Sequence, residues 1–271
     1  MTSPPLAPPA PPLSRRDAVA QIALVSALLA LWAAAIRLSG LGERIESAVG
    51  SLWLVFAVAL QGVPVLLVVA VLLARRREPW SSVGLGRAPL GRTLGQGLLA
   101  ALACYLAQPL VVSVYLLATG QPPEALVAQK ADWLGEFAAL PGAAIFPVAA
   151  FVGLYEEVLF RGFLQSRLLV LAAAPAASPA RSPLPGEARP WDPRAAAVVA
   201  LSALLFAVGH AYQGLLGVLQ TLTVGLILGA LTYRSGSVWP AVVAHVGIDT
   251  VGLTMAKYVA PRLQDLLGPG A

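Results

Sequence analysis

Ionisable side chains interrupt three strongly apolar stretches of the chain, and six of them are candidates for chemistry. They are Glu156, Glu157, Arg161, His210, His245 and Asp249. The two histidines are the only ones in the sequence. A charged side chain at the centre of a membrane helix costs roughly 2.5–3.5 kcal/mol on insertion scales, so ionisable residues there indicate function. Carboxylates and imidazoles in a low-dielectric cleft are suited to general acid–base catalysis near neutral pH, which predicts a chemical site inside the bilayer.

The spacing of these residues divides them into pairs. Glu157 and Arg161 are four residues apart, so on a helix they share a face and can form an ion pair. Glu156 lies about 100° around the same helix, so we interpret Glu156 as the working carboxylate and Glu157 as its structural neighbour. Asp249 follows His245 by one helical turn, and both project from one face. A lone histidine in a membrane helix is often an interhelical hydrogen-bond partner, but two histidines in separate polar-bearing segments favour a functional role.

The segments around these residues predict an all-α fold, a polytopic transmembrane helix bundle. Hydrophobic residues make up 58% of the sequence and charged residues 11%, whereas soluble domains are about one-quarter charged. A helix needs about 20 apolar residues to cross the bilayer. The chain supplies about seven such runs, with a range of six to eight, at residues 18–38, 52–74, 94–118, 143–170, 195–211, 214–233 and 238–253.

Local features refine this picture. Gln108 and Pro109 interrupt the third run, and we expect a kink there. Gly153 and Gly209 lie close to the polar residues, where glycine would let helix backbones approach each other. Cys104 is the only cysteine, which excludes an intramolecular disulfide.

Arginine placement predicts the orientation of the chain in its membrane. The arginines in the predicted first, third, fifth and seventh non-membrane segments all fall on one side: Arg15, Arg16, Arg75, Arg76, Arg77, Arg87, Arg92, Arg181, Arg189, Arg194 and Arg234. The opposite loops carry little besides Arg44 and Lys130. Basic loops face the cytoplasm, so we predict a cytoplasmic N-terminus. The arginine-, alanine- and proline-rich composition suggests a GC-rich bacterial source, so we predict that the membrane is a bacterial inner membrane. The net charge of +5 reflects these loop anchors, so nucleic acid is not an expected partner.

The chain divides into regions by composition. We predict a disordered Pro-rich tail over residues 1–17, N-terminal transmembrane helices over 18–118, a catalytic helical core over 140–255 with an irregular cytoplasmic loop at 172–194, and a C-terminal tail over 256–271.

Three motifs in the core resemble those of the CAAX-processing and bacteriocin-processing (CPBP) intramembrane proteases, also called the abortive-infection family. They are E-E-x-x-x-R from Glu156 to Arg161, F-x-x-x-H from Phe206 to His210, and H-x-x-x-N/D from His245 to Asp249. The order of the three, each in a hydrophobic run, makes the resemblance specific. It covers about residues 140–255, and the first three runs carry no specific signal.

The resemblance implies hydrolysis of a peptide bond within or beside the membrane, in a membrane protein or peptide substrate. By the family's metal-free mechanism, Glu156 and His210 would activate water, and the last motif would stabilise the oxyanion. Asp249 stands where many relatives have Asn, and an ionised carboxylate cannot donate to an oxyanion. Asp249 could instead orient His245, be protonated or help to bind a metal.

Other interpretations stay open at this point. Two histidines and a carboxylate could hold a catalytic zinc ion, so a zinc metalloprotease is one alternative. We favour the metal-free enzyme, which would require no cofactor. The sequence has no H-E-x-x-H motif. Outside enzymes, a proton-coupled transporter could use the same residues as a relay, and an immunity or scaffold protein could use them to hold helices together.

Overall fold

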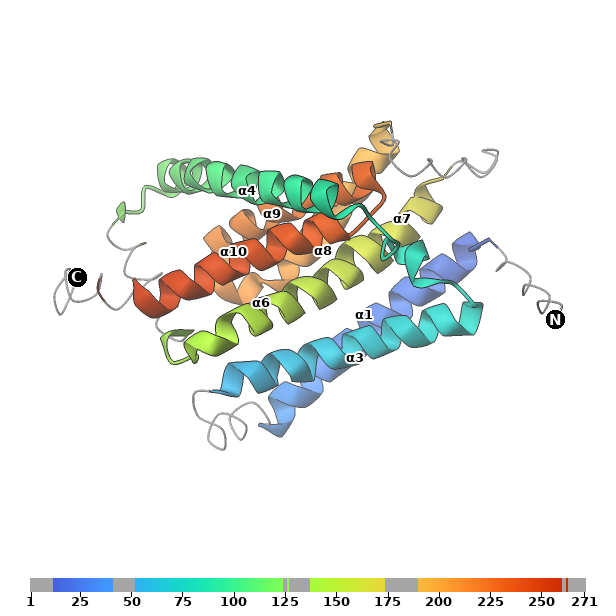
Figure 1. Ribbon diagram of the computed structural model, residues 1–271, viewed down its shortest axis with the longest axis horizontal. Coiled ribbons are helices and arrows are strands. Elements are labelled where there is room, and N and C mark those ends of the chain that lie inside the picture. Colours follow the sequence, from blue (N-terminus) through green and yellow to red (C-terminus); the bar gives the residue numbers. More distant parts are fainter. Residues whose placement is uncertain are drawn as a thin grey trace.

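The computed structural model describes residues 12–40, 52–123, 126, 137–173, 190–259 and 262. These residues form seven helical rods and contain no strand, which confirms the predicted all-α class (Figure 1). The rods are α1 (Arg15–Ser39), α3 (Trp53–Arg76), α4 (Leu90–Thr119), a continuous run of α6 (Gly142–Glu157), η3 (Val158–Leu164) and α7 (Gln165–Ala172), then α8 (Pro193–Gly209), α9 (Gly214–Ser235) and α10 (Trp239–Tyr258). Two short 3₁₀ helices, η2 (Trp80–Val83) and η4 (Ala211–Gln213), lie in connections.

Four segments of the described chain are long and apolar enough to cross a membrane by length and composition. They are Val55–Arg76, Leu90–Thr119, Gly142–Ala172 and Ala211–Ser235. The chain is therefore an integral membrane protein. Each rod coincides with one of the seven predicted runs to within a few residues, but only four segments reach the length and hydropathy of a span, so the predicted count of seven is approximate.

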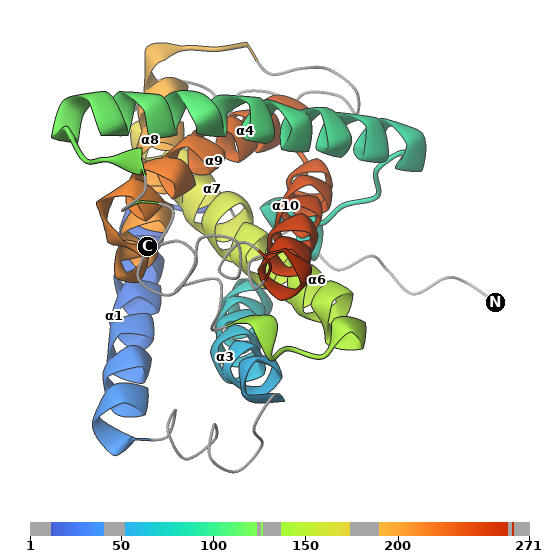
Figure 2. The same ribbon diagram turned by 90° about the vertical axis from the view of Figure 1, so that its left-hand side faces the viewer.

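The rod of α6, η3 and α7 is the centre of the bundle. In its most apolar stretch 50% of the residues are buried, compared with 22% in α3 and 22% in α4. Helix α3 and helix α1 cover one side of it, and α8, α9 and α10 cover the other (Figure 1). Helix α4 lies across α9 and α10 (Figure 2). The E-E-x-x-x-R motif on this rod is therefore surrounded by helices on most sides.

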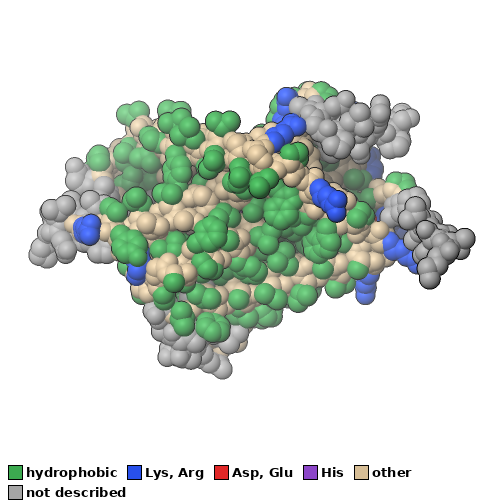
Figure 3. Space-filling model, viewed as in Figure 1, with side chains coloured by type: hydrophobic (Ala, Val, Ile, Leu, Met, Phe, Trp, Pro, Cys, Tyr) green, Lys and Arg blue, Asp and Glu red, His purple; other side chains and the backbone are tan. Residues whose placement is uncertain are grey.

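The helices alternate in direction, and one end of the bundle gathers the basic segments. At this end Arg76 pairs with Asp17 at 2.9 Å, joining the end of α3 to the start of α1. Arg15 also donates to the carbonyl of Leu171 near the end of α7. A surface view shows hydrophobic side chains over the middle of the molecule and most of the visible basic side chains at this end (Figure 3). We call it the basic end.

Local signals explain where the site-bearing helices begin and end. Asp192 caps α8 by accepting from the backbone N–H of Ala195 at 2.8 Å, and Pro193 opens the helix. Gly236 ends α9 with a φ of 66°, in the left-handed region that glycine adopts without strain. Pro240 then lies in the first turn of α10, where its missing N–H costs no hydrogen bond.

Glycine at one predicted position does bring two helices together. A Cβ built on Gly153 would lie 3.0 Å from Val246 Cγ2 and 3.4 Å from His245 Cβ, so α6 and α10 touch here. The same expectation for Gly209 is wrong, because nothing lies within 4 Å of its built Cβ. Gly209 is the last residue of α8, where the chain turns, so no helix face passes it.

Several predicted boundaries need correction. Residues 15–17, assigned to the disordered tail, form the first turn of α1, and residues 256–258, assigned to the C-terminal tail, continue α10. Helix α4 continues through Pro109, and the kink expected there stays a prediction. The predicted tail over residues 1–11 and most of the predicted loop, residues 174–189, lie outside the described residues, as do Arg44 and Lys130.

Candidate active site

Glu157 is the anchor of the polar cluster. Its Oε1 accepts from Arg161 Nη1 at 2.9 Å and lies 2.8 Å from His245 Nδ1. The side chains of Glu157 and Arg161 are both fully buried. The ion pair expected from the four-residue spacing is therefore present, and Glu157 also joins the central rod to α10. The contact at Gly153, one turn earlier, makes this short distance possible.

Glu156 faces a different group of side chains. Its Oε1 accepts from the Tyr155 hydroxyl at 3.1 Å. Its Oε2 lies 3.8 Å from His245 Nε2 and 4.0 Å from His210 Nε2. These two gaps are too long for direct hydrogen bonds but suit a single bridging water molecule. The structure thus brings one carboxylate oxygen and two imidazoles around a common point.

His210 lies in the turn after α8. The prediction had placed it inside a helix over residues 195–211. It is the C-cap of α8, and the short helix η4 follows it. Its Nδ1 lies 2.9 Å from the carbonyl oxygen of Phe206. A carbonyl only accepts, so Nδ1 carries the proton, and in the neutral imidazole Nε2 is left as an acceptor that points toward Glu156.

Asp249 completes the cluster at the more open side. Its Oδ2 lies 3.6 Å from His245 Nε2, as expected for residues one turn apart. The exposed fraction of the side chain rises from 0% in Glu157 through 7% in His245 and 11% in Glu156 to 18% in His210 and 27% in Asp249. The site is therefore closed behind Glu157 and open toward His210 and Asp249.

Phe206 packs the cluster together from α8. Its ring centre is 4.0 Å from the guanidinium carbon of Arg161 and 4.7 Å from the ring centre of His210. It also meets His245 edge to face at 5.9 Å. A cation over an aromatic face is stabilised by the ring quadrupole, so Phe206 lowers the cost of burying Arg161.

The carboxylate motif ends in a segment of π-helix. In η3 the backbone hydrogen bonds join residues that are five apart, an arrangement frequent at functional sites. The Ser202 hydroxyl from α8 donates to the Phe160 carbonyl oxygen at 3.0 Å within this segment. Gly162 lies against the loop before α4, because a Cβ there would be 2.6 Å from the Val83 carbonyl oxygen. The position of Arg161 thus depends on neighbours in two other parts of the chain.

Two residues of the site were missed by the sequence analysis. Tyr155, which directly precedes Glu156, is 3% exposed, and its hydroxyl lies 3.4 Å from Gln61 Oε1 on α3 as well as beside Glu156. A Cβ on Gly62 would lie 2.5 Å from the Tyr155 ring, so α3 also supports the ring itself. Gln61 is a polar residue inside an apolar run, which was the signal available in the sequence.

The spacing of the donor atoms bears on a metal. Among the described residues no group of three or more His, Cys, Asp and Glu is spaced to hold a metal ion. A tetrahedral zinc site with bonds of about 2.0–2.1 Å places neighbouring ligand atoms about 3.3 Å apart. The Nε2 and carboxylate oxygens here are 3.6–4.0 Å apart, which is wider. The cluster would have to contract to bind zinc.

The fold and the site together define a polytopic membrane protein with a buried centre of carboxylates and imidazoles. Residues 138–251 match the family of type II CAAX prenyl endopeptidase Rce1-like proteins. This match supports membership of the CPBP family, and the matched segment contains all six predicted site residues. Helices α1, α3 and α4 lie outside the match. No curated protein and no solved structure matches the chain. Membership supports, in general terms, a CAAX protease-like endopeptidase within a membrane.

Proposed function

We propose that this protein is an intramembrane endopeptidase that hydrolyses a peptide bond of a membrane-associated protein or peptide, with Glu156 and His210 activating water. The observation that supports this assignment most strongly is the position of Glu156 Oε2, 4.0 Å from His210 Nε2 and 3.8 Å from His245 Nε2. Water bridging Glu156 and His210 can lose a proton to either group while its oxygen attacks a carbonyl carbon.

In this mechanism Glu156 is the general base. Tyr155 holds one oxygen of its carboxylate, which leaves the other directed at the water. His210 accepts a hydrogen bond from the same water through Nε2, because its Nδ1 proton is engaged by Phe206. After attack, the proton taken by Glu156 can pass to the leaving amine, so one group serves as base and then as acid.

His245 would stabilise the oxyanion. The carboxylates of Glu157 and Asp249 lie beside opposite nitrogens of His245, at 2.8 Å and 3.6 Å. Carboxylates can only accept, so this arrangement suits an imidazole that donates from both nitrogens. The Nε2 proton then points into the site and can donate to the developing oxyanion, a contribution worth roughly 3–4 kcal/mol per donor elsewhere. Asp249 acts in this scheme by orienting His245.

The enzyme would need no metal. The wide spacing of the ligand atoms supports this choice over a zinc mechanism. The same residues could approach a zinc ion only by moving inward, and the chemistry that zinc would supply is polarisation of the carbonyl and of the attacking water.

The substrate would reach the site from the open side, toward His210 and Asp249. The matched family acts on CAAX prenyl proteins by its description. Because we infer a bacterial source from the composition, we propose unprenylated membrane proteins or peptides as substrates, with the lipid bilayer as the other partner. The arginines at the basic end support a cytoplasmic N-terminus in a bacterial inner membrane.

The test is cleavage by purified protein in lipid nanodiscs. Wild-type protein and Glu156→Gln would be incubated with a library of membrane-derived peptides and the products read by mass spectrometry. Glu156→Gln keeps the shape of the side chain but removes the base, so we expect cleavage to vanish while the melting temperature is retained. Asp17→Asn, which neutralises a half-exposed carboxylate at the basic end, is the control and should cleave normally.

Unchanged cleavage by Glu156→Gln would refute the assignment of the base. A proton-driven uptake that Glu156→Gln abolishes, with no peptide cleavage by either protein, would instead identify a transporter.

A further inference from the structure

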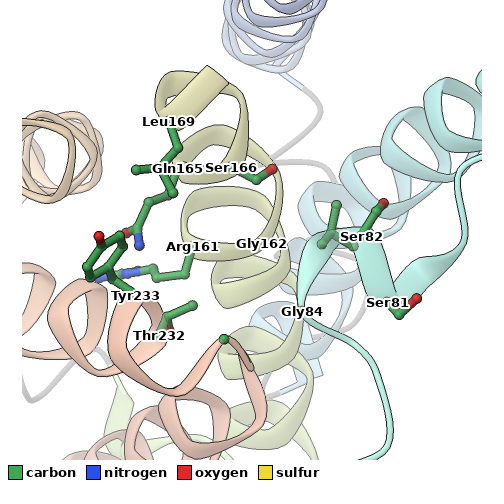
Figure 4. Close-up of a pocket in the computed structure, with 12 residues that line it drawn as sticks. Ser81, Ser82, Gly84, Arg161, Gly162, Gln165, Ser166, Leu169, Thr232 and Tyr233 are labelled. Carbon is green, nitrogen blue, oxygen red and sulfur yellow. The ribbon is translucent and has the colours of Figure 1, made fainter. Parts of the chain in front are cut away.

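Space remains beside the polar cluster on two sides, and the two sides differ in what they reach. At the basic end a pocket of about 80 Å³ is bordered by Arg161 and Gln165, which extend from the central rod toward α9 (Figure 4). Neither Glu156 nor His210 is among the described residues that line it. On the other side, the side chains of His210 and Asp249 are 18% and 27% exposed. A peptide that is to meet Glu156 therefore approaches at this open side.

Tyr212 lies at the open side, next to His210. It belongs to η4, the short 3₁₀ helix that follows His210, and the two ring centres are 5.9 Å apart with the ring planes inclined by 31°. The Tyr212 hydroxyl is within electrostatic reach of both Glu156 and Asp249. Tyr212 is nevertheless 71% exposed. A large aromatic ring thus packs beside the imidazole of His210 and keeps most of its own surface uncovered.

The turn that carries His210 also fixes the position of Tyr212. The His210 carbonyl oxygen accepts from the backbone N–H of Gln213 at 3.0 Å, which closes the turn around Tyr212. Gly214 follows with a φ of 74°, in the left-handed region that glycine adopts without strain. Gln213 packs against the start of α9, because a Cβ built on Gly217 would lie 2.3 Å from Gln213 Cβ. The backbone on both sides of Tyr212 is therefore held in place.

The contacts of Tyr212 differ from those of a tyrosine that joins helices. Tyr105 on α4 donates from its hydroxyl to the Ile248 carbonyl oxygen on α10 at 3.2 Å, so it links two helices. The hydroxyl of Tyr212 accepts instead from Nε2 of the next residue, Gln213, at 3.2 Å. The ring contact of Tyr212 is with His210, two residues before it. Both contacts stay inside one turn, so neither joins Tyr212 to a second helix, and the exposed ring is free to contact a ligand.

The position and chemistry of the ring indicate what it binds. A tyrosine ring supplies a large, rigid contact area at a low cost in conformational entropy. Because Tyr212 lies next to His210, a group that covers its ring belongs to the part of the peptide beside the bond under attack. The ring is apolar, and the carboxyl groups of Glu156 and Asp249 disfavour an acidic side chain nearby. The partner that fits is a large apolar side chain, such as that of leucine, methionine or phenylalanine.

We propose that Tyr212 is a substrate-binding residue whose ring packs against a large apolar side chain of the peptide next to the scissile bond. The inference rests on the proposed function, which it deepens by naming a preference of the site. It adds to the family motifs a residue that contacts substrate and takes no part in the proton transfers. Tyrosines also anchor helices at membrane interfaces, and removal of a ring with only that role would leave peptide affinity unchanged.

The experiment measures peptide binding apart from cleavage. Glu156→Gln protein in lipid nanodiscs would be titrated with fluorescent peptides that carry leucine, alanine or aspartate at each position in turn, and Kd would be read from fluorescence anisotropy. We expect leucine at one position to tighten binding about tenfold over alanine, as partial burial of a large apolar side chain would give. Tyr212→Ala in this background should lose that preference, whereas Tyr212→Phe, which keeps the ring, should retain it.

Tyr258→Ala is the matched control, because Tyr258 is 50% exposed but is the last residue of α10, beyond Asp249. This variant should keep the preference for leucine. A second readout needs no substitution at Tyr212. A bound leucine-containing peptide should protect Tyr212, and not Tyr258, from hydroxyl-radical modification.

The absence of a leucine preference in the Glu156→Gln protein would overturn the proposal. So would the same Kd values for Tyr212→Ala and Tyr258→Ala, or a Tyr212→Phe variant that has lost the preference. The proposed function is tested by a different measurement. Cleavage that persists in Glu156→Gln, or that is absent from the wild-type protein, refutes it whatever affinity the Tyr212 variants show.

Discussion

Removal of the Tyr155 hydroxyl should slow the chemical step without weakening substrate binding. Tyr155 donates to Glu156 Oε1 at 3.1 Å and is 3% exposed, so it touches the proposed base but lies too deep to touch a peptide. Tyr155→Phe leaves the ring packed against Gly62 and removes only the oxygen. The perturbation therefore isolates the orientation of one carboxylate.

The size of the effect follows from the geometry. A hydrogen bond to a charged group is worth about 1.5–3 kcal/mol. The distance of 3.1 Å is long for an O–H donor to a carboxylate, and the same hydroxyl lies 3.4 Å from Gln61 Oε1, so the lower value applies. A loss of about 1.4 kcal/mol corresponds to a rate about ten times slower. We expect kcat to fall about tenfold, with KM unchanged because ground-state binding is untouched.

The assay is steady-state cleavage of a fluorogenic peptide, chosen from the products of the library experiment, by protein in nanodiscs. Tyr233→Phe is a matched control, since its hydroxyl donates to the Pro190 carbonyl oxygen at 2.9 Å and not to Glu156. Equal kcat values for Tyr155→Phe and the control would refute the proposed positioning of Glu156. A rise in KM at unchanged kcat would also contradict it, because it would show that Tyr155 contacts the substrate.

Substitutions at three further positions test separate parts of the structure. Arg167→Leu should lower the melting temperature strongly, because the Arg167 side chain is 3% exposed and pairs with Glu78 at 2.6 Å. Loss of one partner of a buried ion pair costs roughly 3–5 kcal/mol. Activity per folded molecule in the same nanodisc assay should be retained. Gly153→Leu should abolish cleavage and lower the melting temperature, because its side chain would separate α6 from α10, and a fully active, stable variant would show that this contact is dispensable. Asp249→Asn should keep measurable kcat, since an amide can still orient His245, whereas Asp249→Ala should lose most of it, and equal rates for the two would exclude an orienting role.

The sequence predicted the fold class and most of the helix positions because these depend on local hydrophobicity. Apolar runs of about 20 residues mark membrane helices whatever their neighbours are, so every rod was found. The pairing of Glu157 with Arg161 and of His245 with Asp249 was equally accessible, since residues four apart on a helix are neighbours.

Other features depended on contacts between distant parts of the chain. His210 was expected within a helix, but α8 ends one residue earlier, and the turn directs the imidazole at Glu156. Gly153 and Gly209 look alike in the sequence, yet only Gly153 has a helix against it. The support that Gln61 gives to Tyr155 joins residues 94 positions apart, and no local pattern specifies it. The π-helix after Glu157 likewise depends on neighbours such as Ser202.

The most direct test of the central claim is peptide cleavage in water enriched in ¹⁸O by protein from which metals have been removed. If Glu156 and His210 activate a water molecule without a metal, the demetallated enzyme stays active and each new C-terminal carboxyl group carries one ¹⁸O atom. Glu156→Gln then yields no labelled product. A requirement for stoichiometric zinc, or ¹⁸O-labelled product formed equally by Glu156→Gln, would contradict the account.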